Sequence, residues 1–109
     1  MKLATCGHVC LDLVHTHNSL PKPGGKAQAQ STHVSLGGGA AIAAGEIRRL
    51  GGDVDVFTVL GDPGELVTQG TVNLLRGLGV GLDNLNFAPG VTPSMSQVWM
   101  DHQDERTIS

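Results

Sequence analysis

Aromatic side chains are scarce in this sequence, which holds one Trp, two Phe and no Tyr among 109 residues. An all-β sandwich relies on bulky aromatic residues in its core, so their scarcity favours an α/β domain with tightly packed layers. No apolar run approaches the ~20 residues that a membrane-spanning helix needs. The first residues do not form a secretion signal, because His8 and Asp12 interrupt the apolar stretch. With only two cysteines, the sequence predicts a cytoplasmic protein that does not contact a membrane.

Positive charge is also limited, with 7 Lys and Arg against 10 Asp and Glu and a formal net charge of -3. Proteins that bind nucleic acids usually carry a basic patch or stripe, and the sequence has none. We therefore expect no nucleic acid partner. The length of 109 residues corresponds to one small domain or to part of a larger one.

Glycine, in contrast, is abundant, and Gly37, Gly38 and Gly39 open a segment of small residues. Helical spacing of the residues that follow predicts a helix over residues 40–50, with Gly51 as its stop signal. The predicted buried side of this helix consists of Ala40, Ala43, Ala44, Ile47 and Leu50. A glycine-rich loop that leads into a helix N-terminus presents N–H groups and a positive dipole end to a ligand.

The rest of the chain alternates between strand and helix patterns, as in an α/β domain. Strands are predicted over residues 3–14, 53–60, 84–88, 94–100 and from 105 onward. Asp62 as N-cap and Glu65 three positions later predict the start of a helix that ends at Leu78. The polar residues 15–36 predict a hairpin-like excursion. Its histidines are expected on the exposed surface: His15, His17 and His33.

Strand alternation would place Cys6, His8, Cys10 and Asp12 on one face of the first predicted strand. We expect no metal site there, because Cys6 and Cys10 would be ~13 Å apart, too far to share one ion. The two cysteines are interpreted as buried structural thiols. Asp12 stands near the carboxyl end of the predicted strand, where open α/β sheets bind ligands, and is a candidate binding residue. A solvated strand end or a cap is the alternative interpretation of this carboxylate.

The glycine-rich segments do not match nucleotide-binding motifs. Gly24-Gly25-Lys26 lacks the first glycine and the final Ser or Thr of a phosphate-binding loop. Ile42 stands where a dinucleotide-binding fingerprint starting at Gly37 needs its third glycine. A nucleotide-binding domain built on this loop therefore ranks third among the functional hypotheses.

Several short motifs occur in an order that is typical of one family. They are Gly7 to Asp12, the turn from Pro21 to Gly24, the glycine loop with Arg49-Leu50-Gly51, Gly61-Asp62, Leu78-Gly79-Val80, Thr92-Pro93 and Glu105 to Ile108. Together these motifs resemble the N-terminal part of the ribokinase/pfkB family of carbohydrate kinases. The resemblance extends over nearly the whole chain, and the shared order of the motifs carries it.

The resemblance implies an α/β, ribokinase-like fold with a central, mostly parallel sheet, flanking helices and a small β lid. Residues 1–109 would be the N-terminal part of one such domain, incomplete at its C-terminal side. The lid would be built from strands around residues 13–36 and 94–109. Lids of this kind often serve as dimer interfaces, so a homodimer through the lid strands is a possible partner arrangement.

The resemblance also implies a site for a sugar or sugar derivative. Asp12 would accept hydrogen bonds from sugar hydroxyls, while Gly38 and Gly39 would let the backbone approach the sugar. Ile42 replaces the Asn that usually contacts the sugar, which points to a modified or phosphorylated ketose. ATP and Mg²⁺ are implied for the full-length family member, whose catalytic Asp lies in a Gly-Ala-Gly-Asp segment near the C-terminus.

This chain contains no such segment, so we expect no catalytic residue in it. The leading hypothesis is the sugar-recognition part of an ATP-dependent carbohydrate kinase, inactive as 109 residues alone. The alternative is a non-catalytic module, made of the half-domain alone, that binds a sugar or forms dimers.

Overall fold

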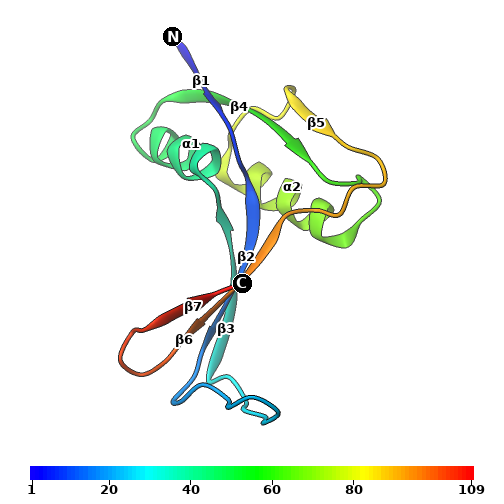
Figure 1. Ribbon diagram of the computed structural model, residues 1–109. Coiled ribbons are helices and arrows are strands. Elements are labelled where there is room, and N and C mark those ends of the chain that lie inside the picture. Colours follow the sequence, from blue (N-terminus) through cyan, green and yellow to red (C-terminus); the bar gives the residue numbers. More distant parts are fainter. The chain divides into compact units, whose positions relative to one another are not determined.

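The computed structural model describes residues 1–109, which form two helices and seven strands (Figure 1). The chain divides into two compact units. The first unit comprises residues 1–11 and 36–94, and the second comprises residues 12–35 and 95–109. No helix combines the length and the apolar character that crossing a membrane requires.

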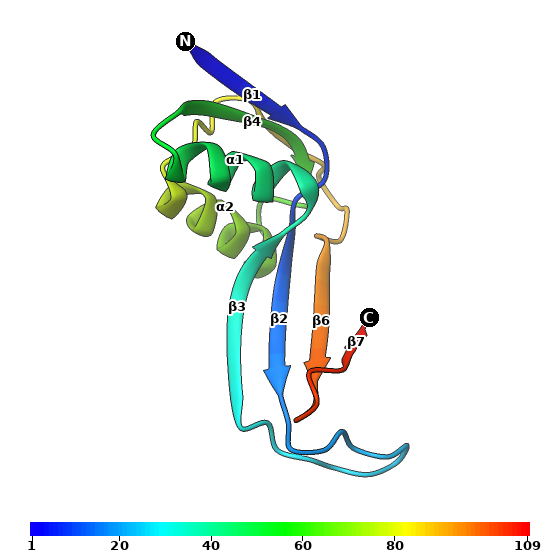
Figure 2. The same ribbon diagram turned by 90° about the vertical axis from the view of Figure 1, so that its left-hand side faces the viewer.

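The first unit contains a parallel sheet with the strand order β1 (Lys2–Cys6), β4 (Asp53–Leu60) and β5 (Leu85–Phe87). The helices α1 (Gly39–Arg49) and α2 (Leu66–Leu78) lie on the same side of this sheet (Figure 2). Parallel strands joined through helices are the arrangement of an α/β fold. The predicted α/β class with a parallel sheet is therefore confirmed.

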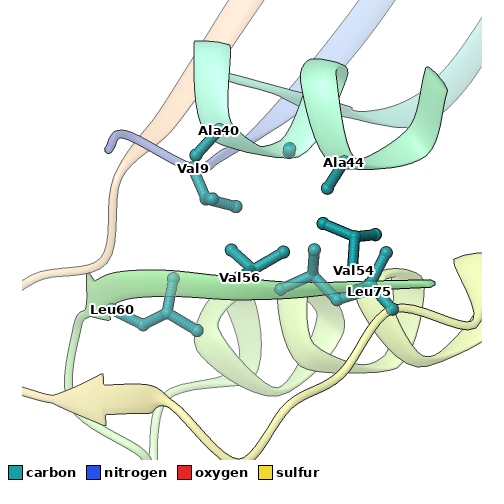
Figure 3. Packing of buried hydrophobic residues seen from close by; sticks show 9 residues of the cluster. Val9, Ala40, Ala44, Val54, Val56, Leu60 and Leu75 are labelled. Atoms are coloured by element: carbon teal, nitrogen blue, oxygen red, sulfur yellow. The ribbon is translucent and has the colours of Figure 1, made fainter. Parts of the chain in front are cut away.

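Strand β4 alternates between buried and exposed side chains, and its position confirms the strand predicted over residues 53–60. The buried side chains point toward the helices and form the core of the first unit (Figure 3). The labelled core residues are Val9, Ala40, Ala44, Val54, Val56, Leu60 and Leu75. Because alanine adds little bulk, α1 packs directly onto the valines of β4.

The buried side of α1 differs from the predicted one. Ala40 and Ala44 are buried as expected, but Ala43 is exposed and Leu50 is 74% exposed. Ala41 is buried in place of Ala43. A run of alanines offers no difference in hydrophobicity from which the orientation of the helix can be predicted. Leu50 is the C-cap residue and lies where the helix ends.

The face of the sheet opposite the helices is uncovered. Cys6 and Phe57 are register partners on β1 and β4, and both are exposed. Val59, two residues further along β4, is 67% exposed. The prediction that both cysteines are buried is therefore wrong for Cys6, whereas Cys10 is buried. Parallel sheets are usually covered on both faces, so this face lacks its usual cover.

The single strand predicted over residues 3–14 is wrong. It is divided into β1 and β2 (Cys10–Thr16), which belong to different sheets. The break occurs at Gly7, whose φ of 148° favours glycine. The Gly7 N–H donates to the Phe57 carbonyl at 3.1 Å and closes the pairing of β1 with β4. Asp12 consequently lies inside β2 and not near a strand's carboxyl end.

Helix α2 begins later than predicted, because its N-cap is Glu65 and not Asp62. The Asp62 carboxylate instead accepts hydrogen bonds from the N–H of Gly64 at 2.8 Å and the N–H of Gly90 at 2.6 Å. It thus joins the loop after β4 to the loop after β5. The predicted end at Leu78 is confirmed, with Gly79 in the left-handed conformation that commonly follows a helix.

We predict that these two hydrogen bonds make the stability of the fold depend on pH under acidic conditions. The N–H groups of Gly90 and then Gly64 favour the ionised carboxylate and lower the pKa of Asp62 below its ordinary value of 3.8. Because the pKa is lower in the folded state, the stabilisation is fully present above pH 3.8 and is lost as the pH falls through the folded-state pKa. Urea midpoints should therefore fall less on acidification for Asp62→Asn than for the wild type. Parallel losses of stability in the two proteins would contradict this role of Asp62.

The second sheet has the strand order β3 (Ser31–Gly37), β2, β6 (Met95–Met100) and β7 (Arg106–Ile108). β6 and β7 are antiparallel, and β2 and β6 run in the same direction (Figure 2). The polar turn between β6 and β7 is organised by the Asp101 carboxylate, which accepts hydrogen bonds from the N–H of Gln103 and Glu105. The strands predicted over 94–100 and from 105 onward are confirmed.

Two of the three histidines that were predicted on the exposed surface are less exposed than that. His33 is exposed, but His15 is half-buried and His17 is only 7% exposed. The rings of His15 and His17 lie beside Pro21 and residues 27–29 of the connecting loop. The polar loop thus returns over this face of the sheet, which its composition did not indicate.

Candidate functional site

The glycine loop before α1 owes part of its sequence to packing within the first unit. Gly38 is the N-cap of α1 and has a φ of 90°, in the region that side chains other than glycine rarely adopt. A Cβ at Gly38 would lie 2.2 Å from the carbonyl oxygen of His8. The same oxygen accepts a hydrogen bond from the Ala40 N–H at 3.2 Å. Gly38 is therefore required by the backbone of the fold, whatever ligand the loop binds.

Gly39 has a different environment. A Cβ at this position would meet no atom within 4 Å, and the residue is exposed. The first turn of α1 carries no acidic residue, so the positive end of the helix dipole is not compensated by a side chain there. Gly39 thus leaves open space in front of a helix N-terminus, as expected of a residue that lets a ligand approach.

Ile42 is 64% exposed on α1. It lines an open groove of about 630 Å³ between α1 and α2, together with Leu74 and Leu78. The apolar side chain at this position cannot donate or accept hydrogen bonds. Any ligand that reaches Ile42 therefore contacts it through carbon.

A second cavity of about 210 Å³ lies at the carboxyl ends of the parallel strands. Its wall includes His8 and Leu60, which follow or end β1 and β4, and Thr68 of α2. The Thr68 side chain is buried, and its hydroxyl has no hydrogen-bond partner. Open α/β sheets bind ligands at this edge. The cavity therefore occupies the expected position for a ligand, and no sequence motif marks it.

Asp12 lies in the second unit, on β2, and is half-buried. Its Oδ1 accepts a hydrogen bond from the Ser96 hydroxyl of β6 at 2.6 Å. A hydroxyl donor on the neighbouring strand orients the carboxylate. Because a carboxylate can accept several hydrogen bonds, Asp12 suits a ligand that is rich in hydroxyl groups.

Gly38, Gly39 and Ile42 belong to the N-cap and first turn of α1, but the groove that Ile42 lines includes neither glycine. Asp12 belongs to the other unit. Sequence reasoning missed Ser96 and the contact of the His8 carbonyl with the glycine loop. Ser96 could have been found only from the pairing of β2 with β6, which the sequence pattern did not reveal. Gly7, where the strand breaks, was the available sequence signal for the contact of the His8 carbonyl with the glycine loop.

Several solved structures have the same fold as this chain. A protein from Agrobacterium tumefaciens, provisionally assigned as a ribokinase, matches 99% of this chain with a TM-score of 0.90 and 23% identity. The fold is that of the ribokinase family. The nucleoside kinase of Methanocaldococcus jannaschii, an archaeal member of that family, matches 99% of the chain with a TM-score of 0.79 and 21% identity. A ribokinase from Arabidopsis thaliana, solved in complex with ribose and ATP, matches 98% with a TM-score of 0.78 and 20% identity.

This chain spans about a third of the length of these ribokinase-like structures, namely 35%, 36% and 34%. No family model matches the sequence, and no curated protein matches it. The likeness therefore concerns the fold, and it confirms the ribokinase-like architecture expected from the order of the motifs.

Proposed function

We propose that this chain is the sugar-recognition part of an ATP-dependent carbohydrate kinase of the ribokinase family. The observation that carries the proposal is the ribokinase-like fold over 99% of the chain, combined with a carboxylate and a bare glycine backbone at the positions that the motifs predict. The substrate class is a sugar or sugar derivative that offers several hydroxyl donors.

In this proposal Asp12 accepts hydrogen bonds from sugar hydroxyls. Supporting it, the Ser96 hydroxyl donates to Asp12 Oδ1 and thereby restricts the orientation of the carboxylate. A charged acceptor forms hydrogen bonds that are about twice as strong as those of a neutral one. An oriented carboxylate would also distinguish between epimers of a sugar. It forms a hydrogen bond only with a hydroxyl whose O–H points toward the carboxylate oxygen.

Gly39 provides the space for the sugar, since no atom lies within 4 Å of the position of a Cβ. Ile42 adds an exposed apolar side chain to the same helix. It favours a substrate that presents carbon at this point, such as a modified or phosphorylated ketose whose polar substituents point elsewhere. Gly38 has a structural role, because a Cβ at this position would lie 2.2 Å from the His8 carbonyl oxygen.

The residues of this chain do not fit the nucleotide or Mg²⁺. Gly24, Gly25 and Lys26 lie in a loop of the second unit and not between a strand and the N-terminus of a helix, as a phosphate-binding loop requires. The structure contains no group of three or more His, Cys, Asp or Glu side chains that could hold a metal ion. In this proposal ATP, Mg²⁺ and the catalytic base are held by residues outside this chain.

The uncovered face of the parallel sheet supports a larger parent protein. Phe57 is 41% and Val59 67% exposed on that face, and burying such side chains stabilises a fold by about 1.5–3 kcal/mol each. Further elements of a longer chain would supply this cover.

A second candidate is a non-catalytic sugar-binding or dimerisation module. The edge strands β3 and β7 of the second sheet favour it, because Val34 and Ile108 on them are 47% and 63% exposed. Edge strands offer unpaired backbone groups to another chain. A homodimer through these strands is compatible with either candidate function.

We expect the 109-residue chain to show no ATP-dependent phosphorylation of any sugar, because the proposal assigns the base and the nucleotide site to residues outside this chain. The test combines an assay of the purified chain with the intact mass of the natural protein and the reading frame beyond Ser109. A longer product with a downstream Gly-Ala-Gly-Asp segment supports the kinase. A natural product that ends at Ser109 would instead support the non-catalytic module, and activity of the chain alone would contradict the assignment of roles.

A further inference from the structure

The second unit contains a histidine pair that the proposed function does not use. His15 and His17 are two residues apart on β2, so their side chains lie on the same face of the sheet. Their ring centroids are 6.5 Å apart and the ring planes are inclined by 48°. Two imidazoles in this arrangement can turn one nitrogen each toward a common point.

The hydrogen bonding of the two rings is asymmetric. His15 Nδ1 lies 3.1 Å from the Thr32 hydroxyl of β3. If His15 donates from Nδ1, its Nε2 carries a lone pair, which is the state of a metal-binding imidazole oriented by an outer partner. The Nδ1 atom of His17, in contrast, is buried and has no hydrogen-bond partner. A buried polar atom without a partner is destabilising, so a ligand that pairs with His17 Nδ1 would stabilise the second unit.

Both rings line a cavity of about 430 Å³ that belongs entirely to the second unit. The other polar side chains in its wall are Gln28 and Gln97, and Trp99 forms part of the same wall. No Lys, Arg, Asp or Glu lines the cavity. The wall therefore holds no positive charge that would repel a cation. It also holds no carboxylate that would attract a hard cation, so the imidazole nitrogens are the groups that select a metal ion.

We propose that His15 and His17 form a binding site for a transition-metal dication, of the class of Zn²⁺, Ni²⁺ or Cu²⁺. Imidazole nitrogen is a preferred ligand of these ions, whereas Mg²⁺ and Ca²⁺ prefer oxygen. With metal–nitrogen distances of about 2.0–2.1 Å, two rings on one ion have centroids roughly 5–6 Å apart. The observed separation of 6.5 Å is slightly larger than that range, so the two rings must move closer together when the ion binds.

The site offers two histidine ligands and no third His, Cys, Asp or Glu within the group. In this proposal water fills the remaining coordination positions, and Gln28 and Gln97 line the same cavity. Structural zinc sites use four protein ligands. With only two, this site is expected to bind its ion reversibly. This inference is independent of the proposed kinase function, since it involves other residues and another ligand.

Trp99 provides a direct readout, because it is the only tryptophan of the chain and lines the same cavity. We expect Ni²⁺ to quench its fluorescence with saturation at one ion per chain, and Zn²⁺ to reverse the quenching by competition. His15→Gln should weaken Ni²⁺ binding at least about tenfold, since even the loss of an outer partner of a metal ligand costs about 10–100-fold. His17→Gln should do the same, and circular dichroism establishes that each variant is folded.

His33→Gln is the matched control, because His33 lies on β3 of the same unit and is exposed. It should bind Ni²⁺ like the wild type. Quenching that persists unchanged in folded His15→Gln, or that is lost equally in His33→Gln, would overturn the proposal. The absence of saturable Ni²⁺ binding to the wild type would overturn it as well, and neither result bears on sugar phosphorylation.

Discussion

Replacing Asp12 by Asn is expected to weaken sugar binding by about tenfold to a hundredfold, which corresponds to the loss of one hydrogen bond to a charged acceptor. Asn keeps the shape of the side chain and an oxygen that can still accept the hydrogen bond from the Ser96 hydroxyl, so the fold should remain intact. The effect should appear in the KM for the sugar of the longer protein, or in the affinity of the chain for a sugar that it binds.

Ser96→Ala is the companion variant for this experiment. It removes the donor at 2.6 Å from Asp12 Oδ1 but leaves the carboxylate in place. Its effect on sugar binding should therefore be smaller than that of Asp12→Asn. If Asp12→Asn unfolds the protein, or binds sugar like the wild type, then Asp12 is a structural residue and its assignment to the sugar is wrong.

Gly38→Ala is expected to produce the largest loss of stability of any single substitution in the glycine loop. The new Cβ would lie 2.2 Å from the His8 carbonyl oxygen, and the φ of 90° is itself strained for alanine. We expect a destabilisation of more than about 3 kcal/mol, a large part of the stability of a small domain. Thermal or urea denaturation of the purified variant measures it.

Gly39→Ala is the matched control, because the added Cβ meets no atom within 4 Å. Alanine favours a helix over glycine by up to about 1 kcal/mol, so this variant should be as stable as the wild type or slightly more stable. Its Cβ would, however, occupy the space assigned to the sugar and should weaken sugar binding. Equal stability of the two variants would contradict the packing described for Gly38, and unchanged sugar binding by Gly39→Ala would contradict the role of Gly39.

The elements with clear local signals could be predicted from the sequence. The strand over Asp53–Leu60 is rich in β-forming residues and is bounded by glycines, and helix α1 is framed by Gly38 and Gly51. These signals are local, so they indicate the two elements without any information on which other elements pack against them. The order of several weak motifs also predicted the ribokinase-like fold, which no single motif could do.

The features that the sequence did not reveal depend on contacts between distant residues. The strand break at Gly7 lies inside an apolar run, and it becomes visible only through the separate partners of β1 and β2. Asp62 satisfies the pattern of a helix N-cap, yet the Gly90 N–H, 28 residues away, competes for its carboxylate. His17 is polar in sequence but is buried by the returning loop.

The residues of the candidate site were chosen from motifs and stay a prediction, whereas their geometry could not be predicted from the sequence. The motifs indicated Asp12 and the glycines, but they could not separate Gly38, which the His8 carbonyl requires, from Gly39, which faces open space. Ser96 carries no motif and was found only as the hydrogen-bond partner of Asp12. Side-chain roles of this kind follow from strand pairing, which a single sequence specifies poorly.

The most direct test of the central claim is an assay of the longer protein for ATP-dependent phosphorylation, with a panel of sugars, sugar phosphates and nucleosides. We predict phosphate transfer to a hydroxyl of at least one carbohydrate, with a KM that rises in Asp12→Asn. A longer protein that binds ATP but phosphorylates none of these compounds, or whose activity does not change in Asp12→Asn, would contradict the assignment of this chain to sugar recognition.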